Sequence, residues 1–317
     1  MLEIGLFLVG FVLLVKGADW LVEGASSIAK RFDVSSLVIG LTIVAFGTSA
    51  PEFFVTLIAQ LKGSSNMALG NVLGSNIANI LLILGASAIV TPIRLQRSTV
   101  WREIPFALLA ACVLLVMLSR ETLDGITTQM IYRSDGLILL GFFLIFLSYS
   151  YEAARTSSAE AELPELPVAK AVLAIVGGII GLALGGQWVV DGALFLARQL
   201  QIDQTFIGVT IIAVGTSLPE LATSLAATAK NRTNIAVGNV VGSNIFNVFY
   251  VLGITAIVRP YHITSAVAID VWMGVIASLL LFFLLFLGPY HLLNRSKGIF
   301  FLLLYAAYLG TTYWLKQ

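Results

Sequence analysis

The sequence predicts an all-α polytopic membrane protein with about ten transmembrane helices, arranged as two inverted five-helix repeats in which helices two and seven are broken. Three observations predict this fold: an apolar composition, a series of apolar segments of membrane-spanning length, and an internal repeat. Hydrophobic side chains make up 58% of the 317 residues and charged ones only 11%, whereas soluble domains have roughly 45–50% and 25%. The net charge of +1 gives no indication of a nucleic-acid partner.

Spanning helices require roughly 17–25 mainly apolar residues, and charged or proline-containing breaks separate the candidates. The expected spans are 2–28, 34–60, 64–91, 101–119, 134–151, 170–198, 204–229, 232–259, 266–288 and 297–315. One connector, 152–169, is acidic, rich in Ser and Ala, and contains two prolines, a composition typical of a flexible linker. We therefore expect a first five-helix repeat at 1–151, a cytoplasmic linker at 152–169 and a second, inverted repeat at 170–317.

The orientation follows from the distribution of Lys and Arg, which accumulate in cytoplasmic loops. More basic residues fall on the side of the 152–169 linker than on the opposite side. This bias predicts that the linker is inside and that both termini are outside, in a protein integral to the membrane, expected to be the plasma membrane of the cell.

The repeat is visible as two pairs of motifs. "GTSAPE" (47–52) recurs as "GTSLPE" (215–220), and "ALGNVLGSNIAN" (68–79) recurs as "AVGNVVGSNIFN" (236–247), with the same offset of 168 residues. By direct count, 25 of the 48 positions in 45–92 are identical to their partners. About five spans separate the partners, and an odd number means that the two halves enter the bilayer in opposite directions.

Inverted repeats with interrupted spans in corresponding places indicate a secondary transporter with an ion site near the midplane. Duplication of a packing unit would explain the repeated glycines, but not the matched polar residues. Pro51 and Pro219 each release the carbonyl four residues earlier. Glu52 and Glu220 follow directly, with no Lys or Arg in the same segments to pair with them. An unpaired, ionised carboxylate is energetically costly at this depth in the membrane, so each glutamate needs a partner. One divalent cation bound between the two glutamates would cancel both charges.

Further side chains with oxygen atoms that could bind a cation lie nearby. Their alternative, purely structural role is helix packing without ion contact. They are Ser49, Ser75 and Asn79 in the first half and Ser217, Ser243 and Asn247 in the second. Such an all-oxygen set suits Ca²⁺, and the absence of His and Cys from these segments argues against zinc or copper. Na⁺ has nearly the same size and accepts the same ligands. Asn76 and Asn244 point about 100° away and are expected to bond the backbone of a broken helix.

At these motifs the chain resembles the sodium/calcium exchanger family of the cation/calcium exchanger superfamily, as a short, prokaryotic-type member. The resemblance covers essentially the whole chain. It implies ten helices, an outside N-terminus and alternating access by sliding of the first and sixth helices past a rigid core. It also implies these ligands: for Ca²⁺, Glu52 and Glu220 with the carbonyls of Thr48 and Thr216; for Na⁺, Ser49, Ser75, Ser217 and Ser243 with the carbonyls of Ala45 and Ala213.

The sequence departs from part of this family at Asn247, where some relatives carry an Asp that is associated with K⁺. With Asn on both sides, the site has two formal negative charges, so potassium coupling is disfavoured. The linker at 152–169 is also too short for the Ca²⁺-sensing domain of animal relatives.

Other features within the spans have packing interpretations. Lys16, Asp19 and Glu23 lie three and four residues apart, so a ladder of mutually paired charges is favoured over a gating role for Asp19, Glu23 and Asp191. Four glycines at spacing four are expected to let helices approach closely. They are Gly70 and Gly74 in the first half and Gly238 and Gly242 in the second.

The sequence therefore favours a Na⁺/Ca²⁺ antiporter rather than an enzyme. The expected partners are Ca²⁺, Na⁺ and the lipid bilayer, and neither a cofactor nor an obligatory protein partner is expected. A Ca²⁺/H⁺ antiporter is the nearest alternative, since Glu52 and Glu220 could bind protons, although four serine hydroxyls favour sodium. A cation channel with a carboxylate filter is the alternative from another class. An intramembrane hydrolase has no support, because His262 and His291 lie outside the repeated motifs at 47–79 and 215–247.

Overall fold

The computed structural model describes residues 2–120, 130–156, 165–199, 213–262 and 267–315. Within these ranges the chain is mostly helical, and six helices are long and apolar enough to cross a membrane, or seven if one bent pair is a single span. The helical membrane class is therefore confirmed. The count of ten spans stays a prediction.

The first half consists of helices, π-helical segments (η) and two short strands. They are α1 (Leu2–Arg31), α2 (Ser36–Ile39), η1 (Gly40–Val44), α3 (Ala45–Thr48), α4 (Ala50–Leu61), α5 (Ser65–Ala78), η2 (Asn79–Leu84), α6 (Gly85–Val90), β1 (Ile93–Arg94), η3 (Thr99–Glu103), α7 (Ile104–Leu118), β2 (Met130–Ile131) and α9 (Arg133–Thr156).

The second half repeats this order where it is described. Its elements are α10 (Val168–Gln199), α12 (Ala213–Gly215), α13 (Leu218–Ala229), α14 (Thr233–Ile245), η5 (Phe246–Leu252), α15 (Gly253–Val258), β3 (Tyr261–His262), α16 (Ala268–Leu284), β4 (Leu292–Leu293) and α17 (Arg295–Leu315). The expected span at 204–229 lies partly outside the described residues, since its first nine positions fall in 200–212.

Both proline motifs interrupt their helices in the same way. The segment Ser36–Thr48 and helix α4 form a pair bent by 45°, and the break falls at Ser49, whose φ and ψ are −83° and 4°. Ser217 has nearly the same values, −87° and 6°. The proline lies in the first turn of each following helix, where its missing N–H is tolerated. The expected break of helix two is thus confirmed, and the described part of helix seven contains an equivalent one.

The two halves interlock rather than forming separate bodies. Strand β1 pairs with β4 through Ile93 and Leu293, and β2 pairs with β3, so each sheet contains one strand from each half. The helices cross over in the same manner. A Cβ on Gly136 of α9 would lie 2.7 Å from the carbonyl of Gly253 in α15, and one on Gly298 of α17 would lie 2.6 Å from the carbonyl of Gly85 in α6. Each half therefore completes the packing of the other.

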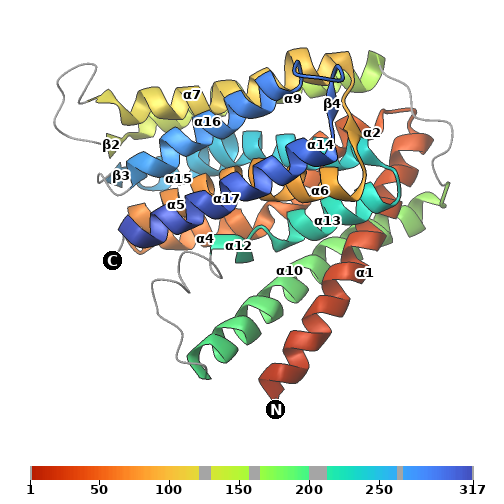
Figure 1. The fold of residues 1–317 in the computed structure, drawn as a ribbon, viewed down its shortest axis with the longest axis horizontal. Helices are drawn as coiled ribbons and strands as arrows, with labels where there is room; N and C mark the ends of the chain where they lie inside the picture. Colours follow the sequence, from red (N-terminus) through yellow and green to blue (C-terminus); the bar gives the residue numbers. More distant parts are fainter. Residues whose placement is uncertain (1, 121–129, 157–164, 200–212, 263–266, 316–317) are drawn as a thin grey trace.

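Helices α1 and α10 run side by side and extend away from the remaining helices (Figure 1). They touch through glycines. A Cβ on Gly17 would lie 2.9 Å from the carbonyl of Gly178, and one on Gly10 would lie 2.9 Å from that of Gly185. These distances are too short for any side chain, so α1 and α10 contact each other backbone to backbone.

Helices α5 and α14 occupy the centre of the bundle. In the spans that contain them, 72% and 83% of residues are buried, against 22% for α9. The expected glycine seam is confirmed in α14, because a Cβ on Gly238 would lie 2.5 Å from the Leu37 carbonyl and one on Gly242 would lie 2.6 Å from the Leu41 carbonyl. Gly70 and Gly74 of α5 have no atom of the described residues within 4 Å, so their part of the seam stays a prediction.

The expected ladder of mutually paired charges on α1 is wrong for Asp19. Its Oδ1 lies 2.7 Å from Nζ of Lys230, at the end of α13. Helix α1 packs against α13, and this packing brings a cation that is remote in the sequence close to Asp19. The ion pair consequently links α1 to the second half of the chain.

Candidate cation-binding site

Glu52 and Glu220 occupy the first turns of α4 and α13, directly after the two breaks. Each side chain is only 1% exposed. A helix N-terminus presents unpaired N–H groups and a partial positive charge, which favours a carboxylate nearby. The proline therefore has two effects at each break: it starts a new helix end and it places a glutamate there.

The serine at each break contacts the glutamate of the other half. Ser49 Oγ lies 2.9 Å from Glu220 Oε1, and Ser217 Oγ lies 3.3 Å from Glu52 Oε1. These two contacts are related by the 168-residue offset. They bring both carboxylates into a single buried cluster, as the sequence predicts.

The serines of the central helices complete this arrangement. Ser243 Oγ lies 2.9 Å from Ser49 Oγ and 3.4 Å from Glu220 Oε1, whereas Ser75 Oγ lies 3.4 Å from Glu52 Oε1. Both helical serines are fully buried. The four predicted serines thus surround the Oε1 atoms of the two glutamates.

Asn79 and Asn247 are held by asparagines of the opposite half. The side-chain amide of Asn79 donates to Asn244 Oδ1 at 2.9 Å, and that of Asn247 donates to Asn76 Oδ1 at 3.0 Å. Since each amide nitrogen is engaged, the orientation of each side-chain oxygen is fixed. Asn76 and Asn244 bond each other's backbone, so the expectation that they bond a broken helix is wrong.

Four buried oxygen atoms of these residues have no hydrogen-bond partner among the described residues, and they form two pairs related by the repeat. They are Glu52 Oε2, Glu220 Oε2, Asn79 Oδ1 and Asn247 Oδ1. Leaving such a group buried and unsatisfied costs about 1–3 kcal/mol, more if it is charged. All four atoms are acceptors when the glutamates are ionised. A cation is the partner that would satisfy them together.

Two asparagines that the sequence reasoning did not select, Asn71 and Asn239, support the glutamates. Asn71 donates to the carbonyl of Glu52 at 3.3 Å and to Thr56 Oγ1 at 2.9 Å, and it accepts from the hydroxyl of Thr216 at 3.1 Å. Asn239 makes the equivalent contacts in the other half. Their identity in both repeats, four residues before Ser75 and Ser243, is the signal that would have found them.

The structure describes the surroundings of only some of the predicted carbonyl ligands. The carbonyl of Ala45 accepts from the backbone N–H of Ser49 at 3.0 Å. The single proton of the nearby Thr48 hydroxyl is engaged by Asn239 Oδ1 at 2.9 Å, so the Ala45 carbonyl has a second lone pair that could reach a cation. Ala213 begins α12, at the edge of the described residues. The roles of these carbonyls and of those of Thr48 and Thr216 stay predictions.

The donor set of the cluster consists of oxygen atoms and contains two carboxylates. Within the described ranges, no group of three His, Cys, Asp or Glu side chains could hold a metal ion. Two carboxylates with hydroxyl and amide oxygens suit hard cations such as Ca²⁺ or Na⁺, and not metals that prefer nitrogen or sulfur.

Comparison with known proteins places this chain in a family. The profile of the family described as "Sodium/calcium exchanger protein" matches residues 2–152 and 170–314. A putative antiporter, CaxA from Alkalimonas amylolytica, is 39% identical over 312 residues and covers 95% of each chain. The sodium/calcium exchanger MaX1 from Methanosarcina acetivorans is 30% identical over 344 residues and covers 98% of each chain.

Solved structures agree with this assignment. The structure of the sodium-calcium exchanger NCX_Mj soaked with 2.5 mM Na⁺ and 1 mM Sr²⁺ matches with a TM-score of 0.83 and 35% identity, covering 98% of both chains. The likeness extends over both halves and over the membrane-spanning helices, and the family is one of transporters. The chain is therefore an integral membrane protein that belongs to the sodium/calcium exchanger family.

Proposed function

We propose that this protein exchanges Na⁺ for Ca²⁺ by alternating access, at a site built on Glu52 and Glu220. The observation that carries the proposal is a set of four buried oxygens that have no partner among the described residues, two from these glutamates and two from Asn79 and Asn247. One Ca²⁺ would neutralise both carboxylates. Na⁺ ions taking up the same oxygens would exclude Ca²⁺, and this mutual exclusion is what antiport requires.

The four serines extend the proposed site on both sides of the glutamates. Ser49 and Ser243 lie beside Glu220, whereas Ser75 and Ser217 lie beside Glu52. Two Na⁺ positions, each with one carboxylate and two hydroxyls, follow from this arrangement. Because a proton needs one acceptor and no coordination shell, the hydroxyls favour Na⁺ over H⁺ as the coupling ion.

The proposed cycle uses ten spans in two inverted repeats, 1–151 and 170–317, joined by a cytoplasmic linker at 152–169. The reciprocal contacts between halves support it, because every contact around Glu52 has a counterpart around Glu220 at the same 168-residue offset. The backbone-to-backbone pair of α1 and α10 is the unit that would slide. Both termini would lie outside the cell membrane.

A cation channel is less favoured by the burial of the cluster. Glu52 and Glu220 are each 1% exposed, which suits an occluded site that releases its ion only after a conformational change. A conducting filter would instead line a continuous water-filled path. The distinction can be measured, since a channel passes Ca²⁺ without a counter-transported ion.

The proposal is tested by Ca²⁺ flux into proteoliposomes that contain the purified protein. An imposed Na⁺ gradient at constant pH should drive Ca²⁺ uptake, and a pH gradient without Na⁺ should not. Uptake that follows pH and ignores Na⁺ would establish the Ca²⁺/H⁺ alternative. Uptake down a Ca²⁺ gradient with neither ion on the other side would establish the channel.

Substitutions connect the flux to the site. Glu52→Gln and Glu220→Gln each remove one charge with little change of shape, and each should abolish Na⁺-driven Ca²⁺ uptake. Glu103→Gln is the matched control, because Glu103 is also a buried glutamate, 2% exposed, on a different helix. Substantial exchange by either site variant would remove that residue from the proposed role.

A further inference from the structure

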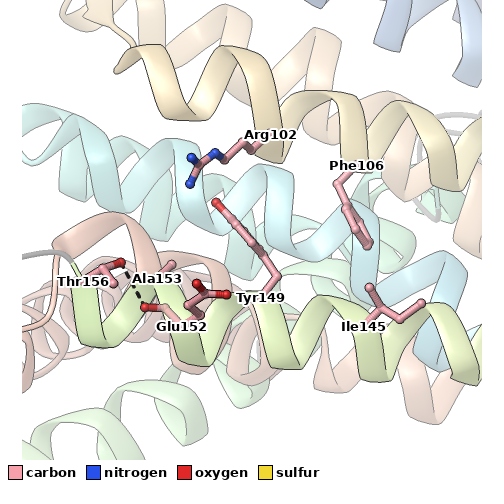
Figure 2. A pocket seen from close by; sticks show the side chains of 7 residues that line it. All are labelled: Arg102, Phe106, Ile145, Tyr149, Glu152, Ala153 and Thr156. Atoms are coloured by element: carbon pink, nitrogen blue, oxygen red, sulfur yellow. Dashed lines mark hydrogen bonds between the residues drawn. The ribbon is translucent and has the colours of Figure 1, made fainter.

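A groove between α7 and α9 lies apart from the cation cluster (Figure 2). It has a volume of about 480 Å³, within the roughly 300–1,000 Å³ that is typical of small-molecule pockets. Seven residues line it: Arg102, Phe106, Ile145, Tyr149, Glu152, Ala153 and Thr156. The groove contains both charged and apolar side chains, which are sorted along its length.

The polar end lies where α9 ends and α7 begins. Arg102 belongs to η3, just before α7, and Glu152 and Thr156 are in the last two turns of α9. Figure 2 shows Phe106 and Ile145 together at the other end of the groove, with Tyr149 between them and the charged residues. Because an α-helix rises about 1.5 Å per residue, Ile145 lies roughly 10 Å deeper along α9 than Glu152.

Arg102 interacts with Tyr149 and with the buried Glu103 on one side, and the remainder of its guanidinium faces outward. Within the described ranges, neither Arg102 nor Glu152 has an oppositely charged side chain within 4.0 Å, since the ion pairs found there involve other residues. Both side chains are exposed. Tyr149 is already engaged, because its hydroxyl donates to the buried carboxylate of Glu103. The groove therefore presents one cation and one anion above a fixed aromatic ring.

The surroundings of the groove are those of a lipid-facing surface. Large apolar side chains of α9 such as Leu144 and Leu147 are exposed, by 65% and 38%, as is Leu109 of α7, by 39%. In a membrane protein such surfaces contact acyl chains. An occupant of the groove would be amphipathic, with its polar part at the helix ends and its apolar part along Phe106 and Ile145.

We propose that this groove binds a phospholipid whose headgroup has a phosphate and a primary ammonium, as in phosphatidylethanolamine. The guanidinium of Arg102 forms paired, charge-assisted hydrogen bonds with phosphate oxygens. The carboxylate of Glu152 accepts from the ammonium, and one acyl chain lies over Phe106 and Ile145. A choline headgroup cannot donate a hydrogen bond to Glu152, and a phosphoglycerol headgroup has no positive charge for it.

The test is a lipid titration of the full-length protein in detergent, read by native mass spectrometry. Phosphatidylethanolamine, phosphatidylcholine and phosphatidylglycerol with the same acyl chains are compared. We expect one tightly retained phosphatidylethanolamine and about tenfold weaker binding of the other two, a difference of about 1.4 kcal/mol. Equal retention of all three lipids, or no retention of any, would overturn the proposal.

Variants locate the lipid. Arg102→Gln and Glu152→Gln should each weaken phosphatidylethanolamine binding about tenfold, and Glu152→Gln should bring its affinity close to that of phosphatidylglycerol. Ala153→Phe fills the groove without changing a charge and should also displace the lipid. Arg97→Gln is the matched control, because Arg97 is an exposed cation near α7 that does not line the groove. Binding that survives Arg102→Gln and Ala153→Phe would place the lipid elsewhere.

Discussion

Asn76 and Asn244 each donate a side-chain hydrogen bond to the other's backbone carbonyl, at 3.2 Å in both directions. This reciprocal pair joins α5 to α14 at the centre of the bundle. The side-chain oxygens of the same two residues accept from Asn247 and Asn79. The pair thus connects the central helices and also fixes the orientation of the two amides whose oxygens have no partner among the described residues.

Replacing Asn76 with Ala should weaken Ca²⁺ binding about tenfold. The substitution leaves the amide nitrogen of Asn247 without its acceptor, so the Asn247 side chain can turn and its oxygen is no longer held toward the cation. The dissociation constant for Ca²⁺, measured by calorimetry on the purified protein, reports this loss, and Asn244→Ala should act in the same way through Asn79. Unfolding should also become easier by about 1–3 kcal/mol, since a buried donor is left unsatisfied.

A control separates positioning from general destabilisation. Ser278→Ala removes another buried hydrogen bond, the one from Ser278 to the Gly274 carbonyl at 2.9 Å, and should lower the unfolding temperature without changing Ca²⁺ affinity. A double-mutant cycle with Asn247→Ala should show strong non-additivity, because Asn76 and Asn247 act through one contact. Additive losses would show that Asn76 does not work through Asn247.

The sequence predicts which side chains lie together in the buried cluster but not the contacts between them, and their role in cation binding stays a prediction. Glu52, Ser75 and Asn79 stand out because each recurs 168 residues later in an apolar setting. Which asparagine bonds which depends on the register between α5 and α14, and that register is set by tertiary packing. The ion-pair partner of Asp19 could not be predicted from the sequence for the same reason. Lys230 is remote in the chain, and only the packing of α1 on α13 brings it near Asp19.

The close contact of α14 with the broken helix of the first half should be sensitive to single methyl groups. A Cβ on Gly242 would lie 2.6 Å from the Leu41 carbonyl and 2.7 Å from the Ala45 Cβ. Gly242→Ala should therefore force the helices apart and destabilise the fold by about 1–3 kcal/mol. The unfolding temperature measured in detergent should fall by several degrees relative to Gly141→Ala, which meets no atom of the described residues within 4 Å. Equal unfolding temperatures would show that α14 can move at no cost.

The ion pair between Asp19 and Lys230 should affect transport more than stability. Both side chains are about one-third exposed, and such pairs contribute about 0–1 kcal/mol. Asp19→Asn should leave the unfolding temperature nearly unchanged. If α1 slides during the cycle, the pair stabilises this conformation alone, and its loss should change the exchange rate by up to about fivefold at saturating ions.

Reversing both charges tests whether the pair itself is responsible. Asp19→Lys combined with Lys230→Asp should restore the exchange rate, whereas each single change should not. A double variant as slow as the worse single variant would mean that one of the residues acts independently of the other. Site-directed spin labels on α1 and α13 would report the change in conformational balance directly.

Removing the hydroxyls of Ser49 and Ser217 should weaken Na⁺ binding more than Ca²⁺ binding. Each hydroxyl lies within 3.3 Å of a glutamate oxygen and is proposed to complete a Na⁺ position, whereas Ca²⁺ would be held mainly by the two carboxylates. Loss of one such ligand at about 1 kcal/mol should raise the Na⁺ concentration for half-maximal Ca²⁺ efflux roughly fivefold in Ser49→Ala and in Ser217→Ala. The half-saturating Ca²⁺ concentration should change less than twofold. Thr255→Ala is the control, because it removes a buried hydroxyl on α15 that bonds the Val251 carbonyl at 2.6 Å and belongs to neither proposed Na⁺ position. Parallel weakening of both ions in either serine variant would mean that Na⁺ and Ca²⁺ share the same ligands throughout, and the flanking Na⁺ positions would have to be abandoned.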